Sequence, residues 1–226
     1  MKYKNEKLQV TIESAELFEI VERPNHIELR ADGVTKFHVF AESTVRAFGS
    51  SSVVAHGSST VEAYDSSTVR AHGSSTVRAF GSSSVVAYDS SSVVAHDSSS
   101  VMAHDSSSVE AYDSSTVRAY GSSTVRAFGS STVVAHDSSS VMAHDSSSVR
   151  AYDSSTVRAF GSSSVVAYNF CCVFVRSGNS KVKPENHFGA IIQQVFKTTK
   201  KIIVFKKLQD NLIAELVLSK GQIFQS

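Results

Sequence analysis

The sequence predicts an all-β solenoid, or β-helix, of sixteen octapeptide repeats between an N-terminal cap and a small C-terminal α+β cap. Three observations support this fold class. The repeats run from Ser43 to Phe170 without a gap, each contains Val and Ala two residues apart, and none contains Pro. A repeat this short cannot bury its own apolar side chains, so neighbouring repeats are expected to stack and bury them together.

Residues 1–42 depart from the repeat and are expected to form the N-terminal cap, including a degenerate first coil. Apolar residues alternate over 8–12 as in a strand, and residues 14–22 are compatible with a short helix. A degenerate octad then places Phe37 and Val39 in the inward positions. An atypical first coil of this kind covers the open end of a solenoid and prevents edge pairing.

Each octad is expected to form one short strand and one corner. Counting from its first Ser, Val at position three and Ala at position five share one side of a strand. Position four varies among Arg, Val, Glu and Met, and position six among Phe, Tyr and His, which indicates an outward side. Asp or Gly at position seven, flanked by Ser, is turn chemistry. The alternative is a disordered linker, but a linker has no physical reason to keep sixteen Val residues in register.

The aromatic position bears on how many octads close one coil. Phe occurs there only in odd-numbered octads, at Phe48, Phe80, Phe128 and Phe160, whereas even-numbered octads contain only His or Tyr. This parity favours two octads per coil and two unequal faces. At roughly 4.8 Å per strand spacing, about eight such coils would make a rod about 38 Å long. A five-octad similarity also occurs in the repeat, and a three-sided coil stays open as an alternative.

Three parts are predicted along the chain: the cap over 1–42, the solenoid over 43–176 and a basic C-terminal module over 177–226. Residues 171–175 are expected to form the last and bulkier coil of the solenoid. Residues 171–226 contain nine Lys or Arg against three acids, a net charge of +6, whereas the sixteen octads have a net charge of −3. A basic module of this kind indicates solubility or docking to an anionic partner.

The C-terminal module is expected to be a helix followed by a β-meander. After Pro184, apolar residues over 188–196 fall at helical spacing, and Pro is acceptable in the first turn of a helix. Residues 202–208, 212–219 and 222–224 then predict strands joined by polar turns.

A cytoplasmic location and no membrane partner are expected, because the N-terminus is charged and no apolar stretch approaches transmembrane length. The two cysteines, Cys171 and Cys172, are adjacent and would point to opposite sides of a strand, so a disulfide between them is disfavoured. Reduced thiols are the simplest account of them.

Two apparent chemical motifs are better explained by structure. His96, Asp97 and Ser98 contain the residue types of a hydrolase triad, and the string occurs four times, but consecutive side chains diverge rather than converge. Stacking would place His56 and His72 about 5 Å apart, which suggests metal binding. Tyr and Phe replace His freely at this position, however, which favours packing. We therefore expect no enzyme activity, no metal site and no cofactor.

The outward side of each strand is the candidate binding surface. In one octad Thr124, Arg126 and Phe128 share this side, and stacking multiplies them into parallel ladders. The candidate residues of the ladder are Phe48, Phe80, Phe128, Phe160, Tyr64, Tyr112, Arg46, Arg78, Arg126 and Arg158. The candidate docking residues of the basic module are Lys200, Lys201, Lys206 and Lys207.

The octad running from Ala119 to Arg126, Ala-Tyr-Gly-Ser-Ser-Thr-Val-Arg, resembles the octapeptide of bacterial ice-nucleation proteins. The resemblance implies coils of 16 residues, a flat Thr-x-Thr face that orders water, and association through Tyr ladders. It covers the repeats and not the caps. This chain contains no Thr-x-Thr, because Arg, Val, Glu or Met stands where the second Thr would be.

Three functions are compatible with these observations. The first is a non-enzymatic scaffold that self-associates through its aromatic ladder into a homo-oligomer, with the basic module as a docking element for a protein or a polyanion. The second is binding of ice or ordered water, as the resemblance implies. The third is binding of a polyanion or a glycan along the Arg and aromatic ladder, where exposed rings could stack on bases or sugars.

Overall fold

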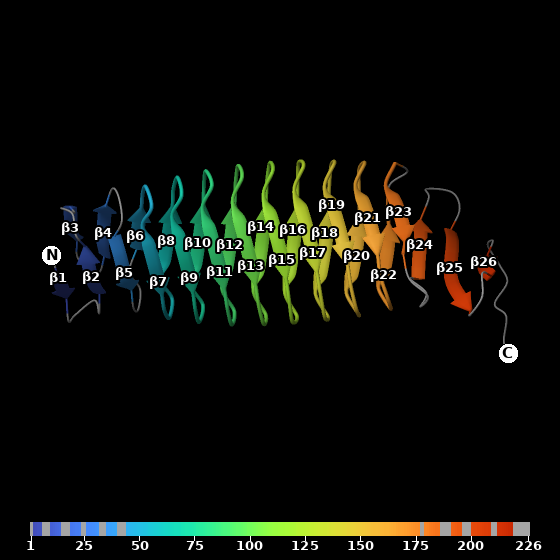
Figure 1. Ribbon diagram of the computed structural model, residues 1–226, viewed down its shortest axis with the longest axis horizontal. Coiled ribbons are helices and arrows are strands. Elements are labelled where there is room, and N and C mark those ends of the chain that lie inside the picture. Colours follow the sequence, from blue (N-terminus) through green and yellow to red (C-terminus); the bar gives the residue numbers. More distant parts are fainter. Residues whose placement is uncertain are drawn as a thin grey trace. The chain divides into compact units, whose positions relative to one another are not determined.

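The computed structural model is an all-β parallel solenoid in which two octads form one coil, as the sequence predicts (Figure 1). It describes residues 2–5, 10–14, 19–23, 26–31, 35–39, 44–176, 179–185, 191–195, 200–208 and 212–218, with side chains described for 38–39, 44–176, 179–183 and 185. The described residues form strands, turns and connecting segments, and no helix occurs among them.

Every octad forms one strand from its second to its fifth residue. The strands of the repeats are β6 (Thr44–Ala47), β7 (Ser52–Ala55), β8 (Thr60–Ala63), β9 (Thr68–Ala71), β10 (Thr76–Ala79), β11 (Ser84–Ala87), β12 (Ser92–Ala95), β13 (Ser100–Ala103), β14 (Ser108–Ala111), β15 (Thr116–Ala119), β16 (Thr124–Ala127), β17 (Thr132–Ala135), β18 (Ser140–Ala143), β19 (Ser148–Ala151), β20 (Thr156–Ala159) and β21 (Ser164–Ala167).

Strands pair in parallel with the strand sixteen residues away, so that like residues stack on like. For example, β10 pairs with β12, and Val77 lies beside Val93 and Ala79 beside Ala95. The coil-to-coil hydrogen bonds continue beyond the strands, because the N–H of His72 donates to the carbonyl of Ala55 (2.9 Å). Most backbone amides of the stack therefore donate to a backbone carbonyl, whereas an amide at the corner, such as that of Gly121, donates to an Asp carboxylate one coil away.

Val and Ala face inward, as predicted, and form the core. Their exposed fractions do not exceed 2 % in any octad. The strands show alternating burial, with positions three and five buried and positions two and four partly or fully exposed. Burying one Val side chain stabilises a fold by roughly 1.5–3 kcal/mol, so the Val rows supply most of the apolar contribution of each coil.

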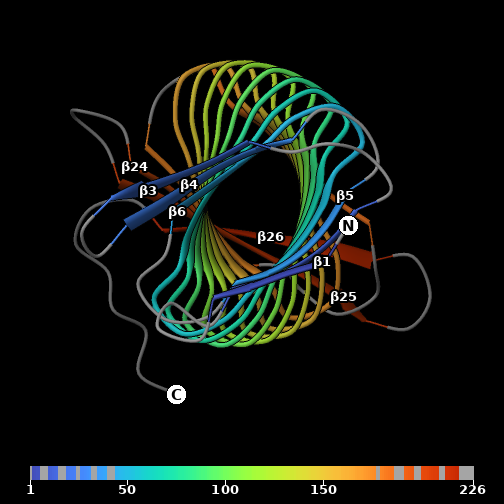
Figure 2. The ribbon, with the colours of Figure 1, turned by 90° about the vertical axis from the view of Figure 1, so that its left-hand side faces the viewer.

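The chain divides into two compact units, residues 1–117 and 118–226, and the boundary falls within β15. In the first unit one sheet has the order β1-β2-β5-β7-β9-β11-β13 and the other β14-β12-β10-β8-β6-β4-β3. In the second unit the orders are β17-β19-β21-β23 and β26-β25-β24-β22-β20-β18-β16. Figure 2 shows that, within each unit, successive coils of the repeats are rotated slightly relative to one another.

The N-terminal strands are β1 (Lys2–Asn5), β2 (Val10–Ser14), β3 (Glu19–Arg23), β4 (His26–Ala31) and β5 (Thr35–Val39). The degenerate octad is confirmed, because β5 pairs in parallel with β7, Phe37 lies in register with Val53, and Val39 is fully buried. The short helix expected over 14–22 is wrong where the structure describes it, because Ser14 ends β2 and residues 19–22 belong to β3, which pairs with β4.

The C-terminal strands are β22 (Cys172–Val175), β23 (Lys181–Pro184), β24 (Ile191–Val195), β25 (Lys200–Leu208) and β26 (Leu212–Leu218). Residues 171–175 do not end the parallel stack, because β23 pairs with β21 and β24 with β22, both in parallel. The helix expected after Pro184 is wrong over 191–195, which form β24. β25 and β26 confirm two of the three predicted meander strands, and the third, 222–224, lies outside the described residues.

Candidate functional site: the outward faces

The two sheets present two chemically different outward faces. The odd-numbered octads form the even-numbered strands from β6 to β20, and we call their outward side the Phe face. The outward side of the even-numbered octads, β7 to β21 by odd strand numbers, is the His/Tyr face. All ten ladder candidates from the sequence lie on the Phe face, which is the outcome expected from two octads per coil.

The aromatic residues of the Phe face form ladders of stacked rings. Tyr64 lies between Phe48 and Phe80, with ring centroids 4.7 and 5.1 Å apart and planes within 10°. In the second unit His144 lies between Phe128 and Phe160, at 4.9 and 4.5 Å. These rings are neither buried nor fully exposed. The faces of an inner ring are covered by its neighbours, so a base or sugar cannot stack on it, and only ring edges and hydroxyl groups are offered outward.

Two of the candidate arginines of the Phe face are held by a carboxylate that the sequence analysis did not connect with them. Arg46 Nε donates to Glu62 Oε2 (2.8 Å), and Arg78 Nη1 lies 3.6 Å from Glu62 Oε1. The hydroxyl of Tyr64 donates to the same carboxylate (3.2 Å). Burial acts to raise the pKa of Glu62, but the hydrogen bond and charge of Arg46, with Tyr64 and Arg78, outweigh it and lower the pKa. In this part of the Phe face the charged and hydroxyl groups of the ladder residues therefore interact with Glu62 on the same face.

The remaining candidates of this face have other neighbours. The hydroxyl of Tyr112 donates to Glu110 on its own strand (3.1 Å). Arg126 and Arg158 lie in register with Met142, one on each side of it. Met142 separates the two guanidinium-bearing residues, so in this part of the second unit position four is cationic and apolar, without a carboxylate.

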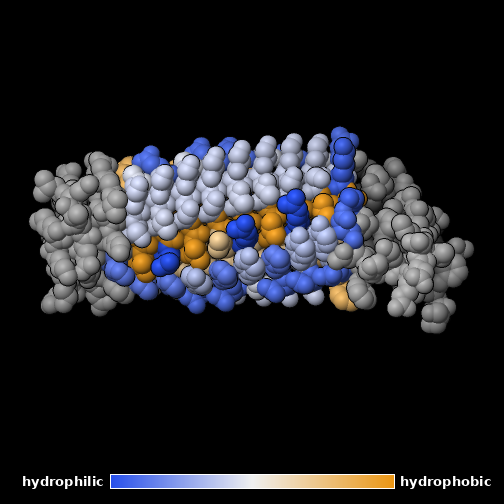
Figure 3. Space-filling model, in the orientation of Figure 1, coloured by the Kyte–Doolittle hydropathy of each residue, from blue (hydrophilic) through white to orange (hydrophobic). Residues whose placement is uncertain are grey.

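The His/Tyr face was not singled out from the sequence, although it has the more continuous row of apolar side chains. Its position-four residues are Val54, Arg70, Val86 and Met102 in the first unit, and Arg118, Val134, Arg150, Val166 and Lys183 in the second. Val side chains here are partly exposed, Met102 is 40 % exposed, and no carboxylate stands in the row over these residues. Figure 3 shows such an apolar row, interrupted by strongly hydrophilic side chains.

Beside this row runs a second ladder of rings. His56 stacks on His72 (5.1 Å) and His72 on Tyr88 (4.8 Å), which confirms the spacing predicted for the histidines. Partial burial, followed by the charges of His72 and His38, lowers the pKa of His56. Among the residues that the structure describes, no group of three or more His, Cys, Asp or Glu side chains is placed to hold a metal ion.

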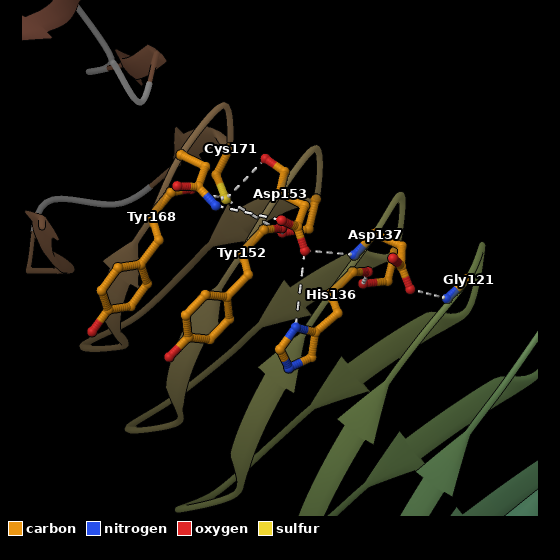
Figure 4. Close-up of polar contacts among 10 residues, drawn as sticks. Gly121, His136, Asp137, Tyr152, Asp153, Tyr168 and Cys171 are labelled. Atoms are coloured by element: carbon orange, nitrogen blue, oxygen red, sulfur yellow. Dashed lines mark hydrogen bonds and ion pairs between the residues drawn. The ribbon is translucent and has the colours of Figure 1, made fainter. Parts of the chain in front are cut away.

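The corners are built by residues with left-handed backbone. Asp137 has a φ of 58°, and its carboxylate accepts a hydrogen bond from the N–H of Gly121 one coil away (2.9 Å). Asp153 likewise accepts from the N–H of Asp137 and lies 3.9 Å from His136 Nδ1 (Figure 4). The Asp side chains thus connect successive coils, while Gly occupies other corners because it adopts a positive φ without strain.

The first Ser of octads two to sixteen is buried, a feature that sequence reasoning missed. In most of these octads the hydroxyl donates to the carbonyl three residues earlier, as in Ser107 to His104 (2.7 Å) and Ser155 to Tyr152 (2.6 Å). Cys171 takes this place after the last octad, and its thiol is buried against the carbonyl of Tyr168. Burial raises the pKa of the Cys171 thiol, which suits an inward packing role.

The docking candidates Lys200, Lys201, Lys206 and Lys207 all lie on β25, which pairs antiparallel with β24 and β26. Their side chains are outside the described set.

No helix of membrane-spanning length and hydropathy occurs in the part of the chain that the structure describes. Comparison with known proteins yields no matching family model, no matching curated protein and no matching solved structure.

Proposed function

We propose that the protein is a non-enzymatic β-solenoid scaffold that self-associates through its outward faces, with the basic C-terminal module as a docking element. The observation that carries the proposal is the position-four row of the His/Tyr face. Its Val and Met side chains are partly exposed beside a ladder of rings, and rows of this kind gain free energy when another surface covers them.

The regular backbone supports the same function. Strands of four residues repeat in one register, so each outward row presents one residue per coil. Such a row loses little conformational freedom when it is covered, because its backbone is already ordered. A second copy offers rows with the same spacing.

The test is light scattering with size-exclusion chromatography on the full chain. The variant replaces the apolar side chains of the row by Thr: Val54→Thr, Val86→Thr, Met102→Thr, Val134→Thr and Val166→Thr. Thr keeps the β-branched shape of Val, and we expect the dissociation constant of the assembly to rise at least about tenfold, which corresponds to about 1.4 kcal/mol.

A matched control changes the other face. Phe48→Tyr, Phe80→Tyr, Phe128→Tyr and Phe160→Tyr keep the stacked rings, because Tyr already occupies position six at Tyr64. If these variants weaken association more than the Thr variants do, the Phe face is the contact. A wild-type chain that is monomeric at every protein concentration and salt concentration would contradict self-association.

Binding of ordered water is a second candidate, supported by the uninterrupted hydroxyl row at position two. In the first unit this row includes Thr60, Thr76, Ser92 and Ser108, paired coil by coil. Thermal hysteresis of a dilute solution tests it, and freezing identical to that of a buffer with albumin at equal mass concentration counts against it.

A further inference from the structure

The two compact units have opposite net charge. Residues 1–117 contain nine Lys or Arg and fifteen Asp or Glu, a net charge of −6. Residues 118–226 contain thirteen Lys or Arg and six Asp or Glu, a net charge of +7. The chain as a whole is nearly neutral, at +1, so the balance between the units hides a strong polarity.

Part of this charge lies on side chains that the structure describes, and these side chains lie on the outside of the coils. In the first unit the exposed carboxylates lie at the corners, at Asp65, Asp89, Asp97, Asp105 and Asp113. Two of the three arginines between residues 44 and 117, Arg46 and Arg78, share the carboxylate of Glu62, which offsets one of their two positive charges. The described part of this unit therefore presents a surface with more negative than positive charges.

The second unit has the reverse arrangement. Its outward cations are Arg118, Arg126, Arg150, Arg158, Arg176, Lys181 and Lys183, of which all except the half-buried Arg158 are exposed. Residues 118–185 contain only four acids against these seven cations, namely Asp137, Asp145, Asp153 and Glu185. Glu185 forms an ion pair with Lys183. No Glu occupies position four in this unit, in contrast to Glu62 and Glu110 in the first.

We propose that the basic second unit of one chain binds the acidic first unit of another copy of the same chain. This inference rests on the proposed self-association and adds which parts meet. Contact between two like units brings charges of one sign together, whereas contact between unlike units brings net charges of −6 and +7 together. Opposite potentials steer encounter and suppress the wrong pairing.

A second copy fits these charges better than an external polyanion does. A long polyanion that reaches the second unit also approaches the first, whose net charge repels it. A second copy matches both units at once, because each acidic unit finds a basic one of nearly equal magnitude. The attraction acts over about 10 Å at 0.1 M salt, so the pairing is expected to weaken strongly as salt is added.

The test uses two variants of the full chain whose new residues already occur at equivalent octad positions. The first-unit variant carries Asp65→Asn, Asp89→Asn, Asp97→Asn, Asp105→Asn and Asp113→Asn, which moves that unit from −6 to −1. Asn169 already adopts the same left-handed corner (φ 55°). The second-unit variant carries Arg118→Glu, Arg126→Glu, Arg150→Glu and Arg158→Glu, which moves that unit from +7 to −1.

Each variant retains one intact unit, so their mixture provides the decisive measurement. Sedimentation at 20 mM salt should show that each variant alone self-associates at least about tenfold more weakly than the wild type. The equimolar mixture should form a one-to-one complex, because the acidic first unit of one variant can still meet the basic second unit of the other. Restored binding also shows that both variants are folded.

The control replaces the same four arginines by Lys, which preserves charge and already occupies position four at Lys183. It should associate like the wild type. Self-association that persists unchanged in both charge variants would overturn the pairing of unlike units and leave the scaffold proposal standing. A mixture that binds no more tightly than its components would also overturn the pairing. A monomeric wild type that is retained on heparin would overturn both proposals.

Discussion

The buried Ser at position one shows how a polar side chain can serve a core of small residues. Its hydroxyl and its N–H both point to the carbonyl of position six, as in Ser107, where the N–H also donates to His104 (3.1 Å). In such a corner the buried hydroxyl is paired within the corner itself, whereas the hydroxyl of Ser99, at the same position of another octad, has no hydrogen-bond partner. Cys171 preserves the same inward geometry with sulfur.

Replacement of this Ser should show that a buried hydroxyl contributes more to stability than an exposed one. Ser107→Ala removes the bond to the His104 carbonyl and leaves a small void, so it should lower the free energy of unfolding by about 1–2 kcal/mol. The adjacent Ser106 is exposed, and Ser106→Ala should change it by less than about 0.5 kcal/mol. Thermal melting followed by circular dichroism measures both. Equal effects of the two substitutions would refute the structural role of the buried hydroxyl.

The stacked histidines make the first unit sensitive to acid. The pKa of His56 lies below 6.5 in the folded chain, so the unfolded chain binds its proton more readily. Stability should therefore fall as the pH drops below 6.5 and continue to fall until the folded pKa is passed. Well above 6.5 His56 is neutral in both states and the effect is absent.

The variant His72→Tyr isolates this effect, because it removes one of the two neighbouring charges while keeping a ring in the ladder. We expect the drop in melting temperature between pH 8 and pH 5 to be smaller in His72→Tyr than in the wild type. His104→Tyr, at a position stacked on Tyr88, is the control for a His to Tyr change elsewhere (5.1 Å). An equal drop in all three proteins would exclude the His56 and His72 pair as a cause.

At the level of the element, the strand of each octad is predictable because three constraints agree. Val at position three favours a strand, position five holds a residue small enough for a narrow interior, and position seven turns the chain. The parity of Phe residues indicates the number of octads per coil for a similar reason, since stacking makes every second octad a neighbour.

The strand β24, where a helix was expected after Pro184, was not predictable in the same way. Ile191, Ile192 and Val195 fit helical spacing, but a short apolar run fits a buried strand equally well. Ile and Val are β-branched, and β22 offers an edge on which Ile192 lies in register with Val173. Residues 191–195 form a strand because the open edge of β22 is available for pairing. The spacing of apolar residues along the sequence contains no information on that edge.

The candidate site was predictable in composition but not in contacts. Ladders of rings follow from the repeat, whereas the closing of ring faces by neighbours depends on the side-chain rotamers. The capture of Arg46 and Arg78 by Glu62 depends on three consecutive coils of one sheet. The buried Ser could not be distinguished by composition, because positions one and eight are both Ser throughout the repeats up to Ser162.

The corner Asp contributes both a backbone conformation and a hydrogen bond, and two substitutions separate them. Asp137→Gly removes the acceptor for Gly121 N–H but tolerates the positive φ, whereas Asp137→Ala removes the acceptor and is strained. We expect Asp137→Ala to destabilise the chain by about 1 kcal/mol more than Asp137→Gly does. Urea unfolding of both variants checks this order. The reverse order would mean that the left-handed corner imposes no cost.

For the molecule as a whole, the coil and not the octad is the unit of construction. Deletion of residues 91–106 removes one coil and lets β10 pair with β14 and β11 with β15 in an unchanged register. Deletion of residues 91–98 removes one octad and exchanges the faces of every later octad. We expect the first variant to melt within a few degrees of the wild type, because each coil contacts only its neighbours.

The one-octad variant should melt well below the one-coil variant, because its ring ladders and its C-terminal strands meet the wrong partners. Circular dichroism melting of the two purified variants measures the difference. Equal melting temperatures would show that either face accepts the other's residues.

This register also constrains the ancestry of the chain. A gene segment that encodes a whole number of coils can be copied or lost while every surviving residue keeps its face, whereas an odd number of octads exchanges the two surfaces. Octads one to six resemble octads eleven to sixteen, an offset of ten octads, which is a whole number of coils. A duplication of whole coils therefore copies both surfaces together and leaves each on its own side of the solenoid.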